Sequence, residues 1–162
     1  MGSKISWLGI LALALVFGIT VIGCDNGSDG GGGPKNNILN GTWLSGYGAE
    51  REELRLGNDT FELTAIEEGV RYPLLKGNYF TSGIDFTMSP THLHGSLLGL
   101  NSQWFTISEL KTLFHNLGME GMLDEELDEV FSSETGPYFL SNNDNTLTIT
   151  LWGDRMVYNR IY

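Results

Sequence analysis

Short runs in which apolar and polar residues alternate fill most of the chain after Ile38. In Thr60–Ala65, for example, Phe61, Leu63 and Ala65 alternate with polar neighbours, which is the two-residue period of a half-buried strand. Gly, Asn and Asp residues typical of turns separate the runs. The runs are Gly41–Ser45, Glu52–Leu56, Thr60–Ala65, Arg71–Leu75, Asn78–Thr81, Ile84–Met88, Tyr138–Leu140, Leu147–Leu151 and Met156–Ile161. The pattern predicts a mainly β domain built from antiparallel hairpins.

One stretch between these runs has helical spacing instead. Thr106 and Glu109 have the arrangement of a capping box at a helix N-terminus, and apolar residues recur every three or four positions as far as Gly118, a common helix stop. A second, shorter helix is expected over Asp124–Ser132. The pair, residues 106–133, is therefore predicted to be a helical insertion before the last strands.

The beginning of the chain has the pattern of a secretory signal. Met1–Lys4 carry a positive charge, Ile5–Ile22 are mostly apolar, and Gly23 precedes Cys24, the only cysteine. The four residues that end in Cys24 resemble the lipobox of bacterial lipoproteins. This resemblance implies a diacylglycerol thioether on Cys24, cleavage after Gly23, and a membrane-anchored protein of the cell envelope. The alternative is a simple transmembrane anchor over the same apolar stretch.

A polar segment follows the cysteine. It is rich in Gly, Asn and Asp and contains no large apolar side chain, so burial cannot offset the entropy lost on ordering. The expected organisation is a signal peptide over residues 1–23, a flexible tether over 24–37, and one β domain over 38–162.

Composition and charge narrow the possible functions. The chain has 20 acidic and 9 basic residues and a formal net charge of −11, so a nucleic-acid partner is not expected, because phosphate contacts need clustered Lys and Arg. A single cysteine excludes an internal disulfide and a thiolate zinc cluster. No motif combines a nucleophile, a base and an orienting group, and no glycine loop follows a strand to hold phosphate. We therefore expect a protein that is not an enzyme and has no cofactor.

The histidines are the remaining metal candidates. His92 and His94 are two positions apart, so both rings would point to one side of an extended segment. The strand before them is predicted to end at Pro90, however, and Thr91–Asn101 is interpreted as a loop. His115 is expected on the polar side of the first helix, facing solvent. A third ligand is not visible in the sequence, and no metal site is predicted.

Three features together resemble the lipocalin pattern. Gly41 and Trp43 form a Gly-x-Trp on the first run, antiparallel hairpins follow, and Arg160 lies on the last run. More specifically, residues 39–162 resemble small lipocalin-like lipoproteins of bacteria, with LNGTW at the start and Tyr-x-Arg at the end. The resemblance implies an antiparallel up-and-down barrel, closed where the arginine packs across the tryptophan ring.

Two functions are open at this point. The first is a lipid-anchored, non-catalytic envelope protein that binds a small hydrophobic ligand inside the barrel. The second is an interaction protein that binds or inhibits another protein through its loops and its acidic helical hairpin. The inward-facing residues that would line a cavity, or equally fill a core, are Phe61, Leu63, Tyr79, Phe86, Met88, Leu147 and Ile149.

Overall fold

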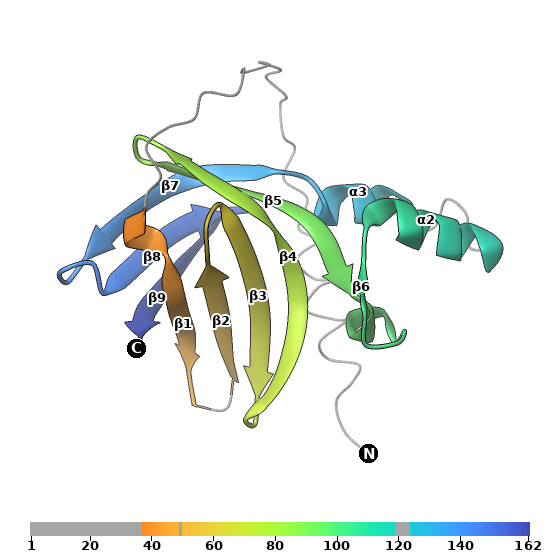
Figure 1. The fold of residues 1–162 in the computed structure, drawn as a ribbon, viewed down its shortest axis with the longest axis horizontal. Helices are drawn as coiled ribbons and strands as arrows, with labels where there is room; N and C mark the ends of the chain where they lie inside the picture. The colour runs from red at the N-terminus through yellow and green to blue at the C-terminus, as the bar shows by residue number, and fades with distance from the viewer. Residues whose placement is uncertain (1–36, 49, 119–123) are drawn as a thin grey trace. The chain divides into compact units, whose positions relative to one another are not determined.

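The fold is known from a computed structural model that describes residues 37–48, 50–118 and 124–162. Figure 1 shows strongly curved strands, with the helices of the insertion beside them. The strands are β1 (Gly41–Tyr47), β2 (Glu50–Leu56), β3 (Thr60–Glu67), β4 (Val70–Ser82), β5 (Asp85–His94), β6 (Trp104–Phe105), β7 (Glu134–Ser141), β8 (Thr146–Leu151) and β9 (Asp154–Ile161). The helical elements are η1 (Asn37–Leu39), η2 (Gly95–Leu98), α2 (Ile107–Asn116) and α3 (Asp124–Val130).

Eight of the strands close into an antiparallel up-and-down barrel, which confirms the predicted fold class. Each strand from β1 to β5 pairs with the next, β5 pairs with β7, and β7, β8 and β9 continue the series until β9 pairs with β1. The short strand β6 pairs only with the end of β5. The β1–β2, β3–β4 and β8–β9 connections, together with the long β5–β7 connection, therefore leave from one end of the barrel. We call this the turn end.

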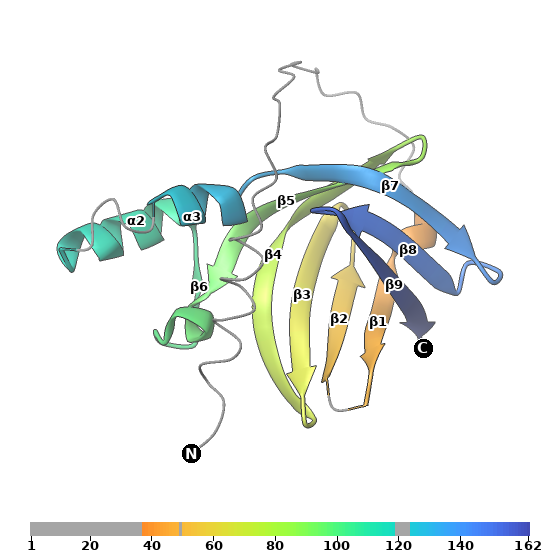
Figure 2. The same cartoon turned by 180° about the vertical axis from the view of Figure 1, so that it is seen from behind.

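The other end carries both ends of the described domain. Asn37 and Tyr162 lie there, together with the β2–β3, β4–β5 and β7–β8 turns, because strand direction alternates around the barrel. Figure 2 shows the same strands from behind, with β7, β8 and β9 nearest the viewer. We call this the terminal end.

Two of the predicted strand runs are one strand. Arg71–Leu75 and Asn78–Thr81 both belong to β4, which continues through Lys76 and Gly77. A Cβ atom at Gly77 would lie only 2.1 Å from the carbonyl oxygen of Ser89. This glycine therefore marks a close approach of two backbones and not a turn.

The prediction that a strand ends at Pro90 is wrong. β5 continues to His94, so Thr91–His94 are strand and not loop. Proline is accepted at this position for two reasons. The register of the β4–β5 pairing shifts here, because Gly77 pairs with Pro90 and the preceding Lys76 pairs with His92. The other edge of β5 pairs with β7 only as far as Met88, so an N–H is not needed at Pro90.

The two helices are inserted between β6 and β7, before the last strands, as predicted. The Thr106 hydroxyl accepts from the backbone N–H of Glu109, and the Glu109 carboxylate accepts from the backbone N–H of Thr106, so the capping box is confirmed. Gly118 follows α2 with a φ of 72°, as a helix-ending glycine does. Lys111 on α2 forms an ion pair with Asp128 on α3 at 2.7 Å.

The insertion has a small core of its own. Leu93 from β5 packs with Leu110 and Phe114 of α2 and with Leu127 of α3. Leu75 of β4 is partly buried and contacts both this cluster and the barrel core. The helices are thus fixed to the barrel wall by apolar contacts near the turn end. Among the described residues, no helix is long and apolar enough to cross a membrane.

Candidate functional site

The terminal end of the barrel is sealed by Trp43 and Arg160. The Trp43 side chain is fully buried, and its indole N–H donates to the carbonyl oxygen of Leu39 at 2.9 Å. The guanidinium carbon of Arg160 lies 4.3 Å from the centroid of the Trp43 ring, within the range of a cation–π contact. The structure thus brings together the two residues that the lipocalin resemblance implies are in contact.

Arg160 also ties the first described residues to the last strand. Its guanidinium donates to the carbonyl oxygens of Ile38 and Asn40. Gly41, the third predicted closure residue, lies beside it with a φ of 147°, a conformation that residues with a Cβ rarely adopt. The segment η1 is therefore held across this end of the barrel.

Tyr79 adds a third fixing point at the same end. Its hydroxyl is 3.2 Å from the carbonyl oxygen of Gly57 and 3.3 Å from the side-chain oxygen of Asn40. Burial raises the pKa of this phenol, and the charge of Asp59 acts in the same direction. The phenol therefore stays protonated and can donate.

The residues predicted to face inward lie together in one apolar cluster. Tyr79 stacks on Phe86 with ring centroids 5.3 Å apart, and Tyr138 meets Phe86 edge-on at 6.0 Å, both favourable aromatic geometries. Leu63 is partly buried and packs against the cluster. The other six predicted residues, all buried within it, are Phe61, Tyr79, Phe86, Met88, Leu147 and Ile149.

Toward the turn end, some inward-facing side chains are partly exposed, and a polar pair lies among them. Leu63, Leu75 and Met156 pack against the cluster but remain partly exposed. Here the buried Tyr158 hydroxyl donates to the carboxylate of Glu52, across β1. Sequence reasoning did not select either residue. The available signal was the alternation within β2, which places Glu52 on the same face as the core residues Leu54 and Leu56.

Both members of this polar pair have shifted acidities. Burial raises the pKa of Glu52, and the hydrogen bond from Tyr158 only partly opposes that effect. Burial and the neighbouring charge of Glu52 raise the pKa of Tyr158 well above its ordinary value. A carboxyl group with a raised pKa inside an apolar barrel is a frequent mark of a functional position.

The next residue, Glu53, has the opposite surroundings. It points to the outer face of the sheet, yet its side chain is only 1% exposed, because two arginines cover it. Arg71 binds both carboxylate oxygens at 2.7 Å, and Arg55 approaches at 2.8 Å. The bond to Arg71 is the largest of the effects that lower the pKa of Glu53.

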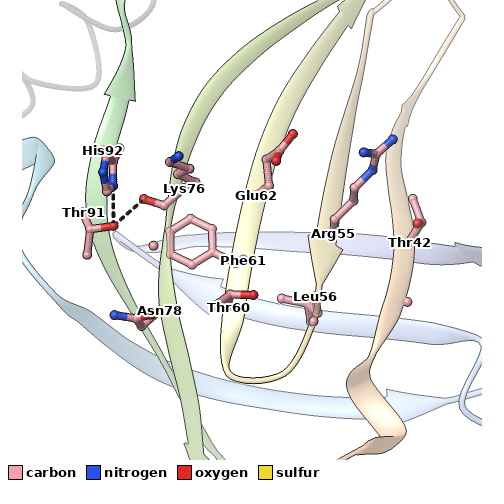
Figure 3. Close-up of a pocket in the computed structure, with 13 residues that line it drawn as sticks. Thr42, Arg55, Leu56, Thr60, Phe61, Glu62, Lys76, Asn78, Thr91 and His92 are labelled. Carbon is pink, nitrogen blue, oxygen red and sulfur yellow. Dashed lines mark hydrogen bonds between the residues drawn. The ribbon is translucent and has the colours of Figure 1, made fainter. Parts of the chain in front are cut away.

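An open pocket of about 570 Å³ lies over the outer face of five neighbouring strands. Figure 3 shows a row of side chains that cross it, one from each of β1 to β5. Consecutive members of the row are partners in the strand register. The row consists of Thr42, Arg55, Glu62, Lys76 and His92. Because it presents both positive and negative groups, this face is suited to polar contacts, unlike the apolar interior.

The two neighbouring histidines take part in local contacts. The His92 ring bonds the Thr91 hydroxyl at 2.9 Å, and burial followed by the charge of Lys76 lowers the pKa of His92. His94 is buried, bonds Ser96 at 2.6 Å and meets the Trp104 ring edge-on. Within the described ranges, no three His, Cys, Asp or Glu side chains are grouped as metal ligands. His115 lies at the exposed end of α2.

Some of the sequence-based predictions concern residues that the structure does not describe. Cys24, the predicted signal peptide over 1–23 and the tether up to residue 36 lie outside the described residues. No protein-family model matches the chain, and neither a curated protein nor a solved structure matches it significantly.

Proposed function

We propose that this chain is a lipid-anchored protein of a bacterial cell envelope that binds a small apolar molecule in its barrel and is not an enzyme. The observation that carries the proposal is the interior of the barrel. One continuous apolar cluster is sealed at the terminal end by Trp43 and Arg160 and is bordered at the turn end by partly exposed Leu63 and Met156. Eight-stranded barrels of this size hold at most one small ligand.

The lipid anchor rests on the sequence that ends in Cys24. Two or three acyl chains would hold the protein on a membrane, since each buried CH₂ contributes about 0.8 kcal/mol. Cys24→Ser should leave the precursor uncut and abolish metabolic labelling with palmitate. Normal processing of the Cys24→Ser variant, together with no palmitate label on the unsubstituted protein, would contradict the lipid anchor.

Ligand binding is tested on the protein from its own cells. The full chain is extracted from membranes in detergent and released from micelles in a native mass spectrometer. Retention of one copy of an apolar molecule, lost when the barrel is unfolded, is the expected result. A spectrum that contains only the protein and its covalent lipid, from gentle and harsh release alike, would count against binding.

A second candidate function is supported by helix α3. Five of its seven residues are acidic, all five are exposed, and only Asp128 forms an ion pair among the described residues. Such a surface is suited to a basic protein partner. In the same mass spectrometry experiment, a co-purified basic protein whose binding weakens steeply with salt would favour this candidate.

A further inference from the structure

Glu52 and Glu53 differ in whether a positive charge faces them. Glu53 has two arginines within 2.8 Å, whereas no Lys, Arg or His of the described chain lies within ion-pair distance of Glu52. Its bonded neighbour is the Tyr158 hydroxyl. A largely buried carboxylate without a cation is costly to ionise. The interior of the barrel therefore contains a carboxyl group for which the described residues supply no positive partner.

The neighbours of Glu52 on the inner face are small. In the strand register, Ser45 of β1 and Ala65 of β3 lie on either side of it. A short side chain at position 45 lets Tyr158 of β9 reach the carboxylate across β1. Met156 lies next to the phenol, with its sulfur 3.5 Å from the hydroxyl. The polar pair thus has small and apolar neighbours, and of its two members Glu52 remains partly exposed whereas Tyr158 is buried.

Further negative charge lies beyond this pair at the turn end. Glu50 of β2 pairs with Glu67 of β3, and strand alternation places both on the same face as Glu52. Together with the net charge of −11, these carboxylates attract cations and repel anions.

We propose that the turn end of the barrel binds an apolar molecule with a protonated primary amine, whose ammonium group pairs with Glu52. The ammonium donates to the free carboxylate oxygen and to the phenol oxygen of Tyr158, which has a lone pair available because its proton points to Glu52. The alkyl part packs on Leu63 and Met156. The inference rests on the proposed ligand-binding function and specifies the chemical class of the ligand.

Three water-soluble probes of equal chain length test the proposal: n-hexylamine, 1-hexanol and N-hexylacetamide. Binding to the full chain in nanodiscs of uncharged lipid is measured by calorimetry, with empty nanodiscs subtracted. Hexylamine should bind about tenfold or more tightly than the two neutral probes, as expected of a hydrogen bond to a charged group. Because this comparison needs no variant, it does not depend on whether a substituted barrel folds.

A matched pair of variants locates the charge. Glu52→Gln should reduce the preference for the amine to about unity, whereas Glu62→Gln, the same change on the outer face, should leave it intact. Equal affinity of the amine and the alcohol would overturn the amine proposal while supporting apolar binding. Failure of all three probes to bind would overturn the amine proposal. Binding of an apolar ligand would then be decided by the native mass spectrometry experiment alone. A preference that survives Glu52→Gln would also overturn the assignment to this residue.

Discussion

Arg160 on the last strand lies over the ring of Trp43 on the first, and it closes the barrel through that contact and through backbone bonds to the segment before β1. The edge of the guanidinium donates to the backbone before β1, and its face lies over the Trp43 ring. One side chain of β9 therefore connects that segment, β1 and β9. The packing of this end therefore depends on both members of the pair.

Trp43→Ala should destabilise the protein by about 3–5 kcal/mol, the usual cost of deleting a buried aromatic side chain. Arg160→Ala should cost less, because a smaller part of its side chain is buried. In a double-mutant cycle, the two changes should be coupled by about 0.5–3 kcal/mol, since the side chains are in contact. Urea denaturation of the four proteins measures the coupling, and losses that simply add would contradict the closure role.

Replacement of Glu52 by Gln should change how stability depends on pH. In the folded protein the pKa of Glu52 is raised from 4.5 by burial, so the unfolded chain loses this proton at a lower pH. The contribution of Glu52 to stability therefore decreases as the pH rises from about 4.5 through the raised value. Glu52→Gln keeps an acceptor for Tyr158 and should remove this decrease. Urea midpoints at stepped pH measure it, and identical profiles would contradict the raised pKa.

Replacement of Glu53 by Gln should have the opposite sign. The pKa of Glu53 is lowered, chiefly by the bond to Arg71, so its contribution is present above about pH 4.5 and is lost as the pH falls through the lowered value. At neutral pH, Glu53→Gln should cost about 1–2 kcal/mol, discounted because both arginines are half exposed. Arg51→Gln on the same strand is the control, and an equal loss there would show a general charge effect.

Replacement of residues 106–133 by a short Gly-Ser link should leave the barrel folded. The helices have a core of their own, and β5 and β7 pair directly without them. Stability should still fall, because Leu75 and Leu93 lose apolar contacts. Far-ultraviolet circular dichroism should show the helical signal lost and the β signal retained. A spectrum typical of an unfolded chain would show that the barrel requires the insertion.

Local patterns were sufficient to predict most of the strands and both helices, although not every strand boundary. The capping box of Thr106 and Glu109 depends on residues three positions apart, and the inward set depends on two-residue alternation; both are visible in one sequence. The contact of Trp43 with Arg160 was reached through a family resemblance, because residues so distant in the chain have no local pattern that joins them.

The continuation of β5 past Pro90 and the buried position of Glu52 were not predicted. Both depend on pairing between residues that are distant in the chain. Pro90 usually ends a strand, but here it lies where both edges of β5 need no N–H, which depends on the register with β4 and β7. Glu52 lies within a run of charged residues that suggests a surface strand. Its partner Tyr158 is more than a hundred positions away in the chain, so the buried pair was not predicted.

The arrangement at the terminal end also determines how the domain would respond to pulling. Any load transmitted from the chain before residue 37 first reaches η1, whose carbonyl groups are bonded to Trp43 and Arg160. Arg160 belongs to β9 and contacts Trp43 of β1, so a pulling force would be distributed over both strands. β1 would then not separate from the barrel by itself. If force is applied from the N-terminal side, the contacts that seal the barrel are therefore also the first ones that resist it.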